Sequence, residues 1–145
     1  MIVVDADVVI GALDASDAHH GEARRLFVDC RERDEAVSIS VVNLSEVLVA
    51  PAADRQVLRR ARAAVSALGV EIQQTTEAIG VDAARLRQRH PISLPDAFCL
   101  AAARHARASL ASFDAKVIRA AESERIATLE WSATTPRTTR PRRGR

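Results

Sequence analysis

The stretch MIVVDADVVIGAL, residues 1–13, holds a strand and a helix joined with almost no loop. Its first four residues form an uninterrupted apolar run, which is typical of a strand buried on both faces of a parallel sheet. Asp5 ends that run. After it, Val8, Val9 and Ala12 recur at the spacing of one helix face. The stretch therefore predicts an α/β fold with Asp5 at the edge of the sheet.

The same alternation continues along the chain. We expect further strands over residues 36–39, 70–73, 109–113 and 125–131, and helices over residues 17–30, 41–50, 54–68, 76–86, 94–105 and 114–121. Alternating strands and helices predict a three-layer α/β/α domain with a central parallel sheet. In such sheets the ligand site lies beyond the carboxyl ends of the strands.

Composition sets the domain boundaries and excludes some functions. The length of 145 residues fits one domain, which we expect to span residues 1–133. Residues 134–145 are expected to be a disordered basic tail, whose five arginines either attract phosphates or only aid solubility. Aromatic residues make up only 3%, which argues against a base-stacking platform for single-stranded RNA.

Cysteine usage and hydropathy indicate the compartment. Cys30 and Cys99 form no CxxC motif, so they are expected to be buried free thiols in a reducing cytoplasm. No apolar run is long enough to span a bilayer. The first residues lack the pattern of a signal peptide. We expect a soluble cytoplasmic protein without a membrane partner.

Four acidic residues lie where strands end or helices begin. They are Asp5, Glu46 in NLSEVL, Asp96 in SLPDAFCLA and Asp114 in LASFDAKV. Strand C-termini and helix N-termini share one edge of a parallel sheet, so these four carboxylates can converge. Carboxylates so close cannot all stay ionised unaided, and Mg²⁺ or Mn²⁺ prefers such oxygen ligands. The pattern favours a metal-dependent phosphodiester enzyme, a ribonuclease in particular.

Each aspartate also has a simpler interpretation. Asp5 and Asp114 can be the N-caps of the helices that follow them. Ser93 and Asp96 form a capping-box pattern, so Asp96 can bond to the cap backbone alone. Glu46 is harder to explain in this way because its neighbours are apolar, and a buried Glu is rare unless it is paired.

The segments VVDADVVIGAL, NLSEVL, LPDAFCLAAA and LASFDAKV resemble, in order and spacing, the motifs of PIN domains. The likeness is closest to VapC-type toxins of bacterial toxin–antitoxin pairs and covers residues 1–131. It implies a small α/β fold, a Mg²⁺ or Mn²⁺ site and endoribonuclease activity on RNA. It also implies a homodimer and neutralisation by a VapB-type antitoxin.

Carried over to this sequence, the resemblance makes Asp5, Glu46, Asp96 and Asp114 the acidic quartet. Asp5 and Asp96 are expected to bind the metal directly, and the other two to complete the site directly or through water. Asp7 is a supporting candidate. Ser112 could donate a hydrogen bond to a carboxylate. For Asp7 and Ser112, local turn bonding is the alternative.

Three rival functions remain open from the sequence. One is a PIN nuclease of housekeeping RNA processing. Another is a catalytically silent PIN-like module that only binds a protein or RNA, although no member of the quartet is missing. The third is a phosphatase of another α/β family, which is disfavoured because Lys116 is the only lysine.

Overall fold

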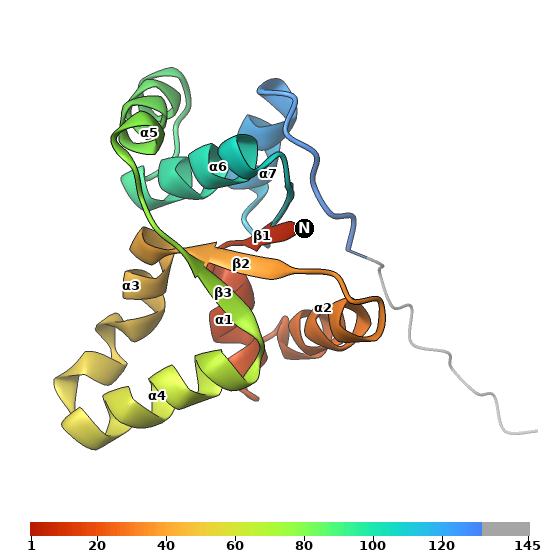
Figure 1. Ribbon diagram of the computed structural model, residues 1–145, viewed down its shortest axis with the longest axis vertical. Coiled ribbons are helices and arrows are strands. Elements are labelled where there is room, and N and C mark those ends of the chain that lie inside the picture. Colours follow the sequence, from red (N-terminus) through yellow and green to blue (C-terminus); the bar gives the residue numbers. More distant parts are fainter. Residues whose placement is uncertain (132–145) are drawn as a thin grey trace, which may run out of the picture.

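A four-stranded parallel sheet lies at the centre of the computed structural model, which describes residues 1–131 (Figure 1). The strands are β1 (Ile2–Val4), β2 (Val37–Ser40), β3 (Val70–Gln73) and β4 (Ser109–Ala111). Their order is β3-β2-β1-β4, and every paired strand is parallel. The carboxyl ends of all four strands therefore lie at one edge of the sheet.

Helices cover both faces of this sheet. They are α1 (Ala6–Leu13), α2 (His20–Glu32), α3 (Val41–Val49), α4 (Arg55–Ala67), α5 (Glu77–Arg89), α6 (Leu94–Ala106) and α7 (Ala115–Ser123), with a short 3₁₀ turn, η1 (Pro51–Ala53). Val3 packs into one core with residues of α5, α6 and α7. Its neighbours Ile2 and Val4 pack into a second core with α1 and α2, as the pleat of a strand requires. The predicted three-layer α/β/α fold is confirmed (Figure 1).

The strand predicted over residues 125–131 is wrong. Thr128 makes a single parallel bridge to Leu110 of β4, and no regular strand forms there. Arg125 takes a positive φ of 57°, and the Ile126 amide still donates to Ala121 O of α7. The first residues of this segment therefore still form the turn that ends α7, and only Thr128 pairs with β4.

Three further expectations concern the cysteines, membrane-spanning helices and the tail. The thiols of Cys30 and Cys99 are buried and free, as predicted. Within the described residues, no helix combines the length and apolar character needed to cross a membrane. The predicted basic tail, residues 134–145, lies outside the described part of the chain.

Glu124 joins the helices on one face of the sheet. Its carboxylate accepts hydrogen bonds from Arg89 of α5, Arg104 of α6 and the ring of His90. The Arg89 hydrogen bond is the main cause that lowers the pKa of Glu124 to about 2. The stability contributed by this carboxylate is therefore present above pH 4.5 and lost as the pH falls towards 2.

We expect Glu124→Gln to lower the thermal unfolding temperature at pH 7 by several degrees, because the two arginines lose their anion. The difference from the wild type should shrink as the pH approaches 2. Thermal unfolding followed by circular dichroism at both pH values checks this. Glu122→Gln, an exposed carboxylate on α7, is the control, and an equal loss in both variants would contradict the prediction.

Candidate functional site

Asp5 lies at the carboxyl end of β1, deep in the molecule. Its side chain is only 4% exposed. Its amide donates to Ala111 O (2.9 Å), which fixes it beside the end of β4. Its Oδ1 accepts from the Ala6 amide (2.7 Å) and so caps α1. The capping interpretation of Asp5 is confirmed, yet this bond uses only one of the two carboxylate oxygens.

Ser112 and Asp7 share the space next to Asp5. Ser112 Oγ lies 2.9 Å from Asp5 Oδ2 and 3.3 Å from Asp7 Oδ2, so its single proton is shared between the two carboxylates. The Phe113 amide also donates to Asp7 Oδ2 (2.8 Å). Asp7 Oδ1 is buried and has no hydrogen-bond partner among residues 1–131. A buried acceptor without a partner is costly, and a bound cation would satisfy it.

Asn43 joins three elements at this edge, a role that its sequence motif alone did not predict. The side chain is fully buried. Its Nδ2 donates to Asp5 Oδ1 (3.3 Å), Glu46 Oε2 (3.3 Å) and Pro95 O (3.1 Å). Ser40 Oγ donates to its Oδ1. The available signal was its position three residues before Glu46, which places both on one helix face.

Glu46 of α3 and Asp96 of α6 complete the cluster. Asp96 Oδ2 accepts from the Ser93 amide (2.8 Å) and forms the capping box that the sequence allowed as an alternative. Asp96 nevertheless lies close enough to the other acids for its charge to raise the pKa of both Glu46 and Asp5. Capping and membership of the acidic cluster therefore coexist in one residue.

Asp114 lies at the rim of the cluster. It is exposed, and its Oδ1 accepts from the Lys116 amide (2.7 Å), which caps α7. Its own amide donates to Ser112 Oγ (3.1 Å). The acids whose charges act on Asp5 are Asp7 and Asp96. The structure thus brings Asp5, Asp7, Glu46 and Asp96 together and ties Asp114 to them only through Ser112.

The clustered carboxylates are like charges that are shielded from water, and both burial and mutual repulsion disfavour their ionised forms. Burial, and next the charge of Asp7, raises the pKa of Asp5 to about 7. Burial also raises the pKa of Asp7, and burial followed by the charge of Asp96 raises that of Glu46. Behind them, burial raises the pKa of the Cys99 thiol, with all four carboxylates adding to it. A cation at this edge would relieve the repulsion.

The cluster fits Mg²⁺ or Mn²⁺ in its donor chemistry. All its ligands are oxygens, and Asp7 Oδ1 is a buried oxygen without a partner among the described residues. In the part of the chain that the structure describes, no three His, Cys, Asp or Glu side chains are already grouped so as to hold a metal ion. Direct binding by three carboxylates therefore requires side-chain adjustment, and the metal roles of the acidic quartet stay predictions.

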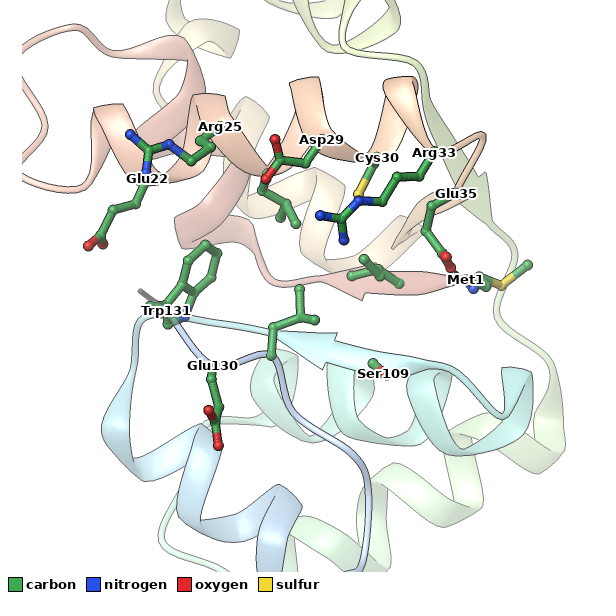
Figure 2. Close-up of a pocket in the computed structure, with 13 residues that line it drawn as sticks. Met1, Glu22, Arg25, Asp29, Cys30, Arg33, Glu35, Ser109, Glu130 and Trp131 are labelled. Carbon is green, nitrogen blue, oxygen red and sulfur yellow. Dashed lines mark hydrogen bonds and ion pairs between the residues drawn. The ribbon is translucent and has the colours of Figure 1, made fainter. Parts of the chain in front are cut away.

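A cavity of about 470 Å³ lies elsewhere, between α2 and the segment that ends at Trp131 (Figure 2). Figure 2 shows Met1 and Glu35 at one end of this cavity and Trp131 at the other. None of the clustered carboxylates lines it. The candidate site is thus the open edge of the sheet and not this cavity.

We expect Asn43→Ala to lower the free energy of unfolding by about 1–3 kcal/mol, because Asp5, Glu46 and Pro95 lose a buried donor. Chemical denaturation at neutral pH measures it. Ser45→Ala, an exposed position on the same helix, should change stability by less than about 0.5 kcal/mol. Equal effects of the two substitutions would show that Asn43 does not hold the site together.

Known proteins share this fold. The family model described as "PIN domain" matches residues 2–123. No curated protein matches the chain. Among solved structures, VapC20 of Mycobacterium tuberculosis, described as a sarcin–ricin loop cleaving toxin, is 24% identical with a TM-score of 0.69, covering 83% of this chain and 95% of that one.

Two further solved structures are similar in fold as well. FitAcB from Neisseria gonorrhoeae is 17% identical with a TM-score of 0.67, covering 90% of this chain and 97% of that one. VapBC2 from Rickettsia felis was solved bound to a DNA fragment from its own promoter. It is 14% identical with a TM-score of 0.67, covering 90% of this chain and 99% of that one. At these identities the likeness concerns the fold.

Proposed function

Because the chain belongs to the PIN domain family, we propose that it is a VapC-like toxin that cleaves RNA phosphodiester bonds as a Mg²⁺-dependent endoribonuclease. One observation carries the proposal. Four carboxylates, one from the junction between β1 and α1 and the others from α1, α3 and α6, gather at the carboxyl edge of the sheet, where the pKa of Asp5 rises to about 7 and Asp7 Oδ1 has no partner among the described residues. Such a site calls for a divalent cation.

The residues divide the work as follows. Asp5 and Asp96 would hold the metal, with Asp7 beside them, and Asp114 would complete the site from the rim. When bound, Mg²⁺ supplies Lewis-acid stabilisation of the phosphoryl oxygens and lowers the pKa of water. To Glu46, which is half-buried and accepts from Asn43 Nδ2, we assign the orientation of the attacking water and the acceptance of its proton.

Asn43 and Ser112 act as positioning residues. Asn43 keeps Asp5 and Glu46 at a fixed separation through its amide. Ser112 holds Asp5 and Asp7 side by side. These hydrogen bonds limit the motion of Asp5, Asp7 and Glu46 before substrate arrives, which favours electrostatic catalysis.

An antitoxin and a second copy of the chain are the proposed protein partners. Solved structures similar in fold include a toxin–antitoxin complex from Klebsiella pneumoniae. On this chain, Val49 of α3 is 70% exposed and Val57 of α4 is 47% exposed. Apolar side chains so exposed on neighbouring helices suit a protein contact. Growth arrest on expression, relieved by a neighbouring gene, would favour the toxin over a housekeeping nuclease.

Cleavage of a structured RNA pool by purified protein tests the proposal. Reactions contain Mg²⁺, Mn²⁺ or EDTA, and Asp96→Asn is compared with the wild type. Asp34→Asn is the matched control because it is exposed, lies before β2 at the opposite edge, and has a φ of 54° that Asn also adopts.

We expect discrete products with Mg²⁺ or Mn²⁺ from the wild type and from Asp34→Asn, and none with EDTA or from Asp96→Asn. If wild-type protein free of antitoxin cuts no more than Asp96→Asn, the enzyme proposal is wrong. A PIN-like binding module would then explain the fold.

A further inference from the structure

Three rings stack on one another beside the acidic cluster. His19 and Phe113 are nearly parallel, with ring centroids 4.1 Å apart and an interplanar angle of 8°. Trp131 lies on the same Phe113, 4.2 Å away and tilted by 31°. The three residues come from the turn before α2, the loop after β4 and the end of the described chain. The stack therefore joins segments that are far apart in the sequence.

Hydrogen bonds between main-chain and side-chain atoms attach this ring stack to the site. The Phe113 amide donates to Asp7 Oδ2 (2.8 Å). Trp131 Nε1 donates to Ser112 O (2.8 Å), and Ser112 also bonds to Asp5. Two of the three rings are thus fixed to the residues that hold the carboxylates, so the position of the stack relative to the site is set.

The two ends of the ring stack differ. Trp131 is half-buried, bonded through its ring nitrogen, and lies at the end of the α2 cavity (Figure 2). His19 keeps 49% of its side chain exposed, and its Nδ1 lies 3.5 Å from a carboxylate oxygen of Glu22. The His19 ring is therefore the end of the stack that another flat group can reach.

We propose that the exposed ring of His19 binds one nucleobase of an RNA strand whose phosphate lies at the carboxylates, so that the ring stack positions the substrate. This inference rests on the proposed function. An uncharged base suits the position, because the neighbouring acids repel anionic groups while every base presents a π-face that stacks on a ring. The chain has only three Phe and one Trp, but two of these four lie in this stack.

Composition alone argues against such a platform. The aromatic content is only 3%, but a composition value does not show where in the fold the aromatic side chains lie. His19 adds a third ring that aromatic counts omit. A single short stack beside the site is enough to hold one base, whereas an extended single-strand binder needs several.

Binding to a cleavage-deficient background tests the inference. Asp96→Asn protein in Mg²⁺ is titrated with a short single-stranded oligoribonucleotide and with a strand of equal length and charge that lacks bases. Trp131 is the only Trp, and the chain has no Tyr, so its fluorescence reports on the ring stack directly. His19→Ala and His19→Phe are made in the same background, with His105→Ala on the exposed end of α6 as the control.

We expect the background protein to bind the intact strand about tenfold more tightly than the abasic strand. His19→Ala should remove this preference, and His19→Phe and His105→Ala should keep it. Equal binding of both strands by the background protein, or an unchanged preference in His19→Ala, would overturn the inference. His19→Phe also guards against misfolding, because a ring at that position keeps the contact with Phe113.

The cleavage assay and the binding titration test the proposed function and this inference separately. Base-dependent binding that needs His19, in a protein that never cuts RNA, would overturn the nuclease proposal alone. Metal-dependent cleavage by the wild type together with equal binding of the two strands would overturn the role of His19 alone.

Discussion

Asp5→Asn should reduce metal-dependent RNA cleavage by about 10³-fold or more while the protein stays folded. Asp5 is the most buried member of the acidic cluster, and the charges of Asp7 and Asp96 both act on it, so a cation at this edge would interact with it strongly. The amide keeps the shape and an acceptor for the Ala6 amide, so α1 remains capped. Initial rates of RNA cleavage, with circular dichroism on the same samples, measure both effects.

Asp54→Asn is the matched control for this substitution. Asp54 is also the N-cap of a helix, accepting from the amides of Gln56 and Val57 at the start of α4. It lies outside the acidic cluster, so the same chemical change should leave the cleavage rate within about twofold. A similar loss in both variants would mean that Asp5 acts only as a cap.

The free energy of unfolding of the metal-free protein should fall as the pH rises from about 4 to about 7. Unfolded Asp5 ionises near 3.8, whereas in the folded protein its pKa is about 7. Between these values the folded state binds more protons than the unfolded state, so raising the pH favours unfolding. The difference corresponds to about 4 kcal/mol. Chemical denaturation in EDTA across this range measures it.

Two comparisons assign this pH dependence to the acidic cluster. Asp5→Asn should flatten most of it, leaving the smaller contributions of Asp7 and Glu46, whose pKa values are also raised. Mg²⁺ should restore stability chiefly above pH 7, where the carboxylates are ionised. Glu124 acts in the opposite direction and only at the acid end of this window, because its pKa is lowered from 4.5 to about 2. Parallel curves for wild type and Asp5→Asn would contradict the assignment.

Local sequence patterns are enough to predict the strands and helix starts that carry the acidic residues of the site. The apolar run before Asp5 identifies a buried strand, and Ser93 with Asp96 identifies a helix start; both follow from neighbours in the sequence. Since parallel strands end at one edge, the sequence alone predicts that their acids lie near one another. The strand predicted over residues 125–131 is reduced to one bridge at Thr128, because the amides of Arg125 and Ile126 still bond to the end of α7.

Tertiary contacts decide the rest. Nothing near Asn43 in the sequence shows that its amide meets Asp5 from β1 and Pro95 from α6. The sequence favours Asp114 over Asp7, yet the packing of the loop after β4 places Asp7 inside the cluster and leaves Asp114 at its rim. The stacking of His19 on Phe113 likewise depends on contacts across more than ninety residues.

β1 is the first strand in the chain but lies between β2 and β4 in the sheet. The site can therefore form only after both neighbouring strands have been synthesised. Val3 pairs with Ser38 on one side and Leu110 on the other, and the bond from Ser112 to Asp5 closes a separation of 107 residues. Contacts between such distant residues form slowly and late, because the chain entropy must be overcome first. During synthesis, Asp5 is therefore made early, but its contacts with β4 and Ser112 can form only after those residues have left the ribosome. A nascent or truncated chain that stops before β4 therefore lacks the Ser112 hydroxyl that holds Asp5 and Asp7 side by side.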